Sequence, residues 1–355
     1  MFREKVPQYQ LAAWLFVAIS APIVQLVGKN GWLPALIAGI ACLGLCWLVT
    51  VLPAGKITQK KWFCVLQLPV ITLVTTEFAK WSVDCWPTGT DFPVVPLTLL
   101  ALAVFSALHG ASVASRVPSV LFWFLAILYG IVLAAGSKNV KAEWLMPGWE
   151  LPQEGLLLTL LLPAVAALLP REKGKGMHIV FPVILLFLAA AALWTVGTIS
   201  PDVASEVAWP FYESSKSLSL LGVAERFESL VSVAMTLGYF SLYSLLLNAA
   251  GAMGEILNPG WGKGAVIACG IATAALTLLM IHTAQGLLVI ITLITWCFLP
   301  VFGGFTELWK KSKKRRKKCL TFQCSFDNIS ERSAMGAQNY KAKPKRKLLR
   351  NEKSS

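Results

Sequence analysis

The chain has 355 residues, of which 56% are hydrophobic and only 14% charged, and its mean hydropathy is +0.65. A soluble globular protein is about one quarter charged, because its exposed surface must be hydrated. The composition therefore excludes an ordinary soluble domain and predicts an all-α protein that crosses a membrane several times.

The net charge of +14 is concentrated at the C-terminal end, where Lys310–Ser355 holds 16 of the 32 lysines and arginines. The rest of the chain is close to neutral, which argues against nucleic-acid binding. A basic cluster directly after an apolar run is expected to bind anionic lipid headgroups. We therefore predict a transmembrane domain over residues 1–309 and a basic, disordered cytoplasmic tail over residues 310–355.

Apolar runs of about 17–25 residues, the length that crosses roughly 30 Å of hydrocarbon, recur along the chain. The ten candidate spans are Gln10–Val27, Trp32–Leu52, Trp62–Val83, Pro93–His109, Val117–Gly136, Gly155–Leu169, His178–Thr198, Glu228–Ala250, Gly264–His282 and Gly286–Leu308. If the N-terminus is cytoplasmic, the inner segments before the tail hold ten lysines and arginines and the outer segments six. With the tail added to the inside, the positive-inside rule predicts that both termini are cytoplasmic.

Two of these spans contain a proline at a comparable place. The first span contains Ser20-Ala21-Pro22, and the short sixth span contains Leu162-Pro163-Ala164. Proline removes a helical hydrogen bond and frees a carbonyl, which membranes tolerate only inside protein or beside a watery cavity. Spans one and six correspond if the chain is two repeats of five, and paired broken helices mark the substrate site of inverted-repeat transporters. Ordinary proline kinks are the alternative.

The third span carries a carboxylate in an apolar setting. Glu77 lies beside Thr72 and Thr76, and Lys80 follows one turn later. A carboxylate at this depth is costly, so it faces a cavity, takes up a proton or finds a partner. Glu77 is thus either part of a proton or amine site or one half of an interfacial pair with Lys80. In the eighth span, Thr236 is typical of a helix–helix hydrogen-bonding group.

Motifs of enzymatic chemistry are missing from the sequence. It contains no phosphate-binding glycine loop, no nucleophile elbow and no metal-ligand cluster. Five of the eight cysteines lie in apolar runs, and Cys319 and Cys324 of the tail have no histidine near them in the sequence. We therefore expect no enzyme, no metal and no cofactor.

The order of several short motifs resembles the endospore germination permeases, the B subunits of germinant receptors in the amino acid–polyamine–organocation transporter superfamily. The stretch Val196–Leu230 is the clearest part. Gly197–Asp202 looks like the family's exit from the seventh span, Ala208-Trp209-Pro210 like its aromatic-proline step, and Glu225–Leu230 like its entry to the eighth. The likeness extends over most of residues 6–310, although the Ser20-Ala21-Pro22 break lacks the family's glycine.

The resemblance implies a ten-helix, five-plus-five inverted repeat of the LeuT type, with broken helices one and six. It also implies a small germinant, typically an amino acid, bound between spans one, three, six and eight. The residues expected to bind it are Ser20, Ala21, Pro22, Thr72, Thr76, Glu77, Pro163, Ala164 and Thr236. The expected location is a bacterial cell membrane or spore inner membrane, and the expected partners are A- and C-type receptor subunits.

Two other functions stay open at this point. A stand-alone amino-acid or amine transporter would have the same fold and would move its substrate without partner subunits. A membrane scaffold that transports nothing would tolerate replacement of Ser20, Pro163 and Glu77.

Overall fold

The computed structural model describes residues 4–29, 31–52, 57–84, 93–145, 151–172, 176–207, 209–216, 227–279, 285–310 and 313. The chain divides into two units, Met1–Gly304 and Phe305–Ser355. In the second unit, residues 305–310 are helical, and residues 314–355 of the predicted tail lie outside the described residues.

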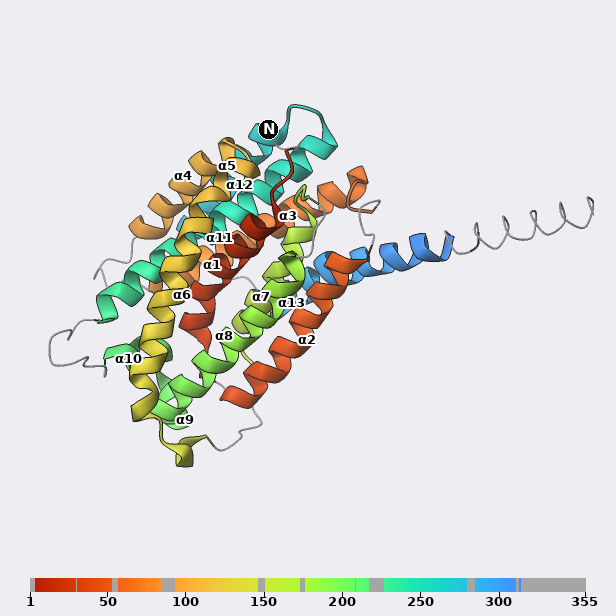
Figure 1. Ribbon diagram of the computed structural model, residues 1–355. Helices are drawn as coiled ribbons and strands as arrows, with labels where there is room; N and C mark the ends of the chain where they lie inside the picture. Colours follow the sequence, from red (N-terminus) through yellow and green to blue (C-terminus); the bar gives the residue numbers. More distant parts are fainter. Residues whose placement is uncertain are drawn as a thin grey trace, which may run out of the picture. The chain divides into compact units, whose positions relative to one another are not determined.

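Helices make up nearly all of the described chain (Figure 1). The α-helices are α1 (Gln8–Leu26), α2 (Trp32–Val51), α3 (Lys61–Asp84), α4 (Val94–Leu108), α5 (Ala111–Ala114), α6 (Arg116–Gly136), α7 (Glu154–Leu161), α8 (Gly176–Ile199), α9 (Pro201–Glu206), α10 (Pro210–Lys216), α11 (Phe227–Leu257), α12 (Gly262–Leu278) and α13 (Gln285–Thr292). The remaining helical turns are the 3₁₀ segments η2 (Ser137–Asn139), η3 (Ala142–Trp144) and η4 (Leu162–Ala167) and the π-helical η5 (Leu293–Phe298).

Seven helical stretches in the described chain are long and apolar enough to cross a membrane. Three shorter apolar helices, Val94–Leu108, Glu154–Ala167 and Gly262–Leu278, coincide with the predicted fourth, sixth and ninth spans. Large apolar side chains such as Ile40, Trp123 and Leu186 are exposed on helix surfaces, as a lipid-facing surface requires. The protein is a multi-pass helical membrane protein, and ten crossings remain a prediction.

The expected break in the first span is wrong, because α1 continues as an α-helix through Pro22. One proline costs a helix a single internal hydrogen bond, and the buried surroundings of Pro22 keep the chain helical on both sides. The sixth span does change conformation. There α7 ends at Leu161, and η4, which includes Pro163, follows as a tighter 3₁₀ helix.

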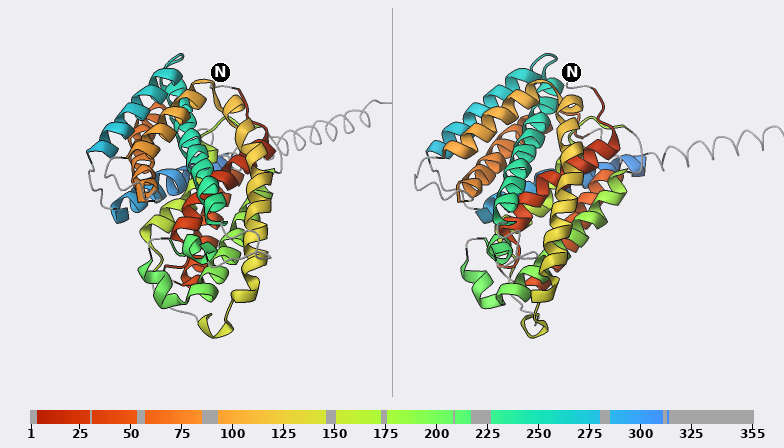
Figure 2. Two further views of the ribbon diagram at one scale, coloured as in Figure 1. Left: turned by 90° about the vertical axis from the view of Figure 1, so that its left-hand side faces the viewer. Right: turned by 60° about the vertical axis from the view of Figure 1, so that its left-hand side comes forward.

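The membrane helices form two groups. In one group α1 and α2 each pack against α7 and α8, and in the other α3, α4, α11 and α12 all contact one another. Both views of Figure 2 show orange α3 and α4 beside cyan α12. Outside the groups, α6 contacts α1, α8 and α11, whereas α13 contacts α3 and α7. The contact of α1 with α11, which joins the two groups, is the most extensive one in the described chain.

A glycine permits the close approach of α1 to α11. A Cβ atom built on Gly238 of α11 would lie 2.5 Å from the Cβ of Ala21 and 3.2 Å from the carbonyl oxygen of Val17. Small residues at helix crossings give membrane helices more van der Waals contact, because hydrocarbon surroundings supply no hydrophobic force between helices. Ala21 therefore has a packing role in this structure.

We predict that Gly238→Ala lowers the stability of the purified protein by about 1–3 kcal/mol, because the added methyl group must push α1 and α11 apart. Gly130→Ala on α6 is the matched control, because nothing lies within 4 Å of its added Cβ and alanine favours a helix. Thermal unfolding in detergent compares the two variants. Equal melting temperatures for both would contradict the role assigned to Gly238.

Candidate functional site

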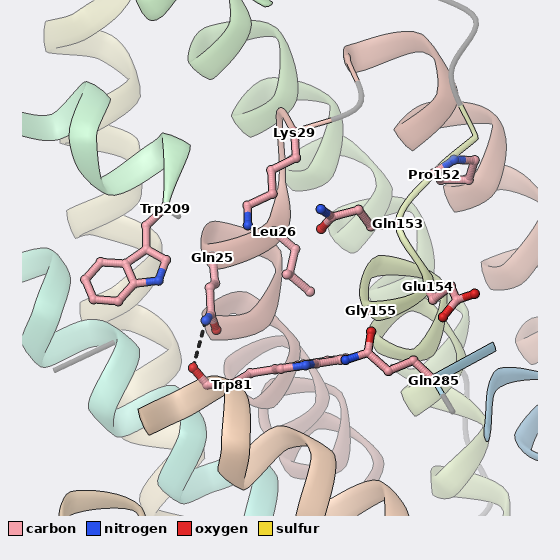
Figure 3. Close-up of a pocket in the computed structure, with 10 residues that line it drawn as sticks. All are labelled: Gln25, Leu26, Lys29, Trp81, Pro152, Gln153, Glu154, Gly155, Trp209 and Gln285. Atoms are coloured by element: carbon pink, nitrogen blue, oxygen red, sulfur yellow. Dashed lines mark hydrogen bonds between the residues drawn. The ribbon is translucent and has the colours of Figure 1, made fainter. Parts of the chain in front are cut away.

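A cavity of about 520 Å³ opens at one end of the helix bundle. It is formed by the C-terminal ends of α1 and α3 and by the N-terminal ends of α7 and α13. We call this cavity the vestibule. Its lining consists of Gln25, Leu26, Lys29, Trp81, Pro152, Gln153, Glu154, Gly155, Trp209 and Gln285. In Figure 3 the Trp81 ring lies across the bottom of the cavity, between Trp209 and Glu154.

The floor of the vestibule is held by a buried amide. Gln25, on the last turn of α1, is only 4% exposed. Its Nε2 donates to the carbonyl oxygen of Trp81 at 2.8 Å, and its Oε1 accepts a hydrogen bond from the hydroxyl of Tyr239 on α11. Because α1 stays helical past Pro22, Gln25 reaches both α3 and α11. A buried amide with partners at both ends is fixed in position.

A second tyrosine one turn further along α11 extends this network. The hydroxyls of Tyr243 and Ser82 lie 2.7 Å apart, and the Tyr243 hydroxyl also donates to the carbonyl oxygen of Phe78 at 3.2 Å. Hydrogen bonds are strengthened in surroundings of low dielectric constant, where water does not compete. The last turns of α3 are therefore tied to α11, and the floor below the vestibule is rigid.

Opposite charges line the vestibule. Lys29 follows α1, and Glu154 is the first residue of α7. An ideal Cβ on Gly286 would lie 2.6 Å from Oε1 of Glu154, so the carboxylate also lies at the N-terminus of α13. Helix N-termini stabilise negative charge, because their backbone N–H groups have no partners within the helix.

Five further residues of the vestibule carry amides or indoles. Gln153 and Gln285 add two exposed or half-buried amides to that of Gln25, and Trp209 forms one wall. The ring of Trp81 lies against Gly155, where an added Cβ would be 2.9 Å from the ring. A cation, a carboxylate, amides and aromatic faces together suit a small zwitterion with an apolar part.

The same helices are joined at the opposite end of the bundle. Val6, just before α1, pairs with Arg171, just after the sixth span: Val6 N donates to the carbonyl oxygen of Pro170 at 3.0 Å, and Glu172 N donates to that of Val6 at 3.1 Å. Arg171 donates from Nη2 to the carbonyl oxygen of Thr50 at 2.8 Å. Burial lowers the pKa of the Arg171 guanidinium from its usual value, because it is partly removed from water. We call this arrangement the clasp.

None of the nine residues predicted to bind a ligand lines the vestibule. Ser20 is buried and donates to the carbonyl oxygen of Val17 at 2.8 Å. Close to it lies the buried Tyr129 of α6, whose hydroxyl has no hydrogen-bond partner in the described chain. Ala21 packs under Gly238, and Pro22 is buried within α1. This part of α1 lies one to two turns below the vestibule.

The predicted residues of the third span are also buried. The hydroxyls of Thr72 and Thr76 donate to the carbonyl oxygens of Leu68 and Thr72, each four residues earlier on α3, at 2.9 Å. Glu77 is 2% exposed and forms an ion pair with Lys80, with Nζ and Oε1 3.0 Å apart. The proposed partnership of Glu77 with Lys80 is therefore present in the structure.

The remaining predicted residues lie elsewhere. Pro163 and Ala164 are buried in η4. In the preceding turn, the carbonyl oxygens of Leu160 and Leu161 lie 3.6 and 3.7 Å from the sulfur of Cys46 on α2. Thr236 lines a different hollow, on the flank formed by α4, α6 and α11. The residues expected in one pocket are thus spread over several places.

The residues that hold the vestibule floor were missed by the sequence argument. Gln25, Tyr239 and Tyr243 are polar groups within apolar runs, and the two tyrosines share a helix face at a spacing of four. Polar groups at such places are the usual marker of a site in a membrane protein. Their spacing is therefore the signal that would have located the floor.

No protein-family model matches this chain, and no curated protein matches it.

We predict that Tyr239→Phe lowers the stability of the protein by about 1–3 kcal/mol, because the buried Oε1 of Gln25 loses its donor. Tyr9→Phe serves as the control, since Tyr9 is exposed and water replaces any lost hydrogen bond. The measurement is thermal unfolding of both variants in detergent. A Tyr239→Phe protein as stable as Tyr9→Phe would show that the hydrogen bond does not hold the floor.

Proposed function

We propose that the chain is the permease subunit of a germinant receptor and that it recognises a small zwitterionic germinant, an amino acid, in the vestibule. The observation that carries this proposal is the presence of Lys29 and Glu154 in one cavity with two tryptophans. A cationic side chain suits a ligand carboxylate, a carboxylate suits an ammonium group, and an indole face accommodates an apolar side chain. The family resemblance in Val196–Leu230 supports the receptor role, in which A- and C-type subunits are the partners.

The helix contacts support the five-plus-five inverted repeat. Taking α1, α2, α3, α4 and α6 as the first half, the second half is α7 with η4, α8, α11, α12 and α13. The contact of α1 with α8 then corresponds to that of α7 with α2, and the contact of α4 with α11 to that of α12 with α3. The contacts of α6 with α1 and with α11 correspond to those of α13 with α7 and with α3. Paired contacts of this kind are what an internal repeat produces, although the contact of α1 with α11 has no counterpart of similar extent between α7 and α3 in the described chain.

The two ends of the bundle differ in a way that suits alternating access. The vestibule is open at the C-terminal end of α1, whereas the clasp joins the N-terminal end of α1 to the residues after the sixth span. With both termini cytoplasmic, as the distribution of lysine and arginine predicts, the vestibule faces away from the cytoplasm. A germinant that binds there would favour one arrangement of the halves, and the partner subunits or an ion pathway would respond to that shift.

The alternative is a stand-alone amino-acid or amine transporter with the same fold. The vestibule and the clasp support this alternative equally, because a transporter also needs a site that is open on one side at a time. Only the motifs between the seventh and eighth spans favour the receptor.

We predict that Lys29→Met and Glu154→Gln each weaken amino-acid binding about 10- to 100-fold, because each removes a charge-assisted hydrogen bond to the zwitterion. Lys138→Met and Glu143→Gln are the matched controls, since both residues are exposed and line no part of the vestibule. Binding is measured with the purified chain and a panel of radiolabelled L-alanine, L-valine and L-tryptophan. The vestibule is not the site if one of these binds and the four variants behave alike.

Receptor and transporter differ in what the chain does alone. For a receptor subunit we expect no uptake of the bound amino acid into proteoliposomes, and loss of one germinant response when the gene is deleted from a sporulating host. Uptake by the wild-type chain together with an intact germination response would support the transporter instead. The double variant Val6→Cys/Arg171→Cys is the inactive control for uptake, because paired backbone segments lie about 4.8 Å apart, within reach of a disulfide that would keep the clasp closed.

A further inference from the structure

A second hollow lies on the flank of the bundle, away from the vestibule. It has a volume of about 660 Å³ and lies between α4, α6 and α11, with α5 at one end. We call it the flank groove. Its walls include Leu99, Leu102 and Phe105 from α4, Val113 from α5 and Phe240 from α11. All five side chains are apolar, and several are exposed at the rim.

The surroundings of the flank groove limit what can occupy it. α6 and α11 belong to stretches long and apolar enough to cross a membrane, and α4 is a shorter apolar helix. A hollow between such helices opens to hydrocarbon, because the bilayer is the solvent of their outer surfaces. An occupant from the aqueous phase would have to cross lipid to reach it, whereas a lipid chain is already present.

The length of the flank groove matches one leaflet. Along α4 and the residue after it, the lining extends from Leu99 to His109, a rise of ten residue steps. At about 1.5 Å per residue this is about 15 Å, or half of the roughly 30 Å hydrocarbon thickness. One acyl chain of a phospholipid in a single leaflet therefore fits the groove from the middle of the membrane to its surface.

A basic residue lies near the α5 end of the groove, as a phospholipid headgroup requires. α4 ends at Leu108, the chain turns through His109 and Gly110, the latter at a φ of +87°, and α5 and α6 follow. Arg116 is the first residue of α6, is exposed and directly precedes Val117, which lines the groove. Glu4, an acid near this turn, accepts a hydrogen bond from Ser112 of α5. Arg116 does not line the groove itself, but an exposed arginine next to a lining residue is within reach of a phosphate at this end of the groove.

We propose that the flank groove is a binding site for one anionic phospholipid, with an acyl chain between α4 and α11 and the phosphate at Arg116. The site is independent of the proposed function, because none of its lining residues belongs to the vestibule. Thr236, which was expected from the sequence to contact a germinant, lines this groove instead. Its hydroxyl donates to the carbonyl oxygen of Ser232 at 2.8 Å.

The test counts lipids on the full chain by native mass spectrometry after incubation with phosphatidylglycerol or phosphatidylcholine. Val113→Trp, at a position 43% exposed on the groove rim, is expected to fill the groove and to lose one retained phosphatidylglycerol. Val120→Trp is the control, because Val120 on α6 is 74% exposed and does not line the groove. Leu102→Trp fills the groove from α4 and replaces Val113→Trp if that variant does not fold.

The headgroup contact is tested separately. Arg116→Gln is expected to keep one lipid but to lower the preference for phosphatidylglycerol over phosphatidylcholine about five-fold, as loss of one basic residue near a membrane surface does. Lys263→Gln, at an exposed lysine of α12, is expected to leave the preference unchanged. Equal lipid retention by Val113→Trp, Leu102→Trp and Val120→Trp would overturn the proposal. An unchanged preference of Arg116→Gln for phosphatidylglycerol over phosphatidylcholine would also overturn it. A dimer whose interface covers the groove would do the same.

Discussion

The close contact of α1 with α11 is the interaction on which the rest of this structure depends. Because Gly238 has no side chain, Ala21 and the backbone of Val17 can pack directly against the backbone of α11. That closeness places Gln25 of α1 within hydrogen-bonding reach of Tyr239 of α11. A larger residue at position 238 would push the two groups of helices apart. It would also pull Gln25 away from Tyr239 and so disrupt the floor of the vestibule. Packing in the middle of the bundle thus determines the geometry of a site one turn above it.

The helical membrane class and the approximate limits of the helices follow from the sequence, because hydrocarbon leaves a spanning segment few alternatives to a helix. The effect of the two prolines does not follow in the same way. Pro22 lies in a buried stretch of α1 and leaves that helix continuous, whereas Pro163 lies in η4, directly after the short helix α7 has ended. The same residue type has different consequences because the neighbouring helices, which the sequence does not reveal, decide whether the helix continues.

The candidate site could not be assembled from the sequence for a related reason. Its residues come from the ends of four helices and from Trp209, and the distance in sequence from Gln25 to Gln285 says nothing about their proximity. The prediction instead favoured residues near the two proline breaks and beside Glu77, and these proved to be packing positions or groups with partners in their own helix, such as Thr72 and Thr76. Glu77 is the exception: its ion pair with Lys80 is one of the two alternatives that the sequence left open, and it could be foreseen because both residues lie on one helix.

α11 contributes residues to both the vestibule floor and the flank groove. Tyr239 points to α1 and holds the vestibule floor, while its neighbours Thr236, Leu237 and Phe240 line the flank groove. Positions 236, 239, 240 and 243 follow the three- and four-residue spacing of one helix face, so the floor tyrosines and the groove residues lie side by side on α11. A rotation of α11 about its axis would move both sets at once. A lipid that binds the flank groove in only one rotational position of α11 would therefore also fix Tyr239. Fixing Tyr239 would favour one position of Gln25, to which it donates a hydrogen bond. α11 is therefore the helix that the flank groove and the vestibule floor share.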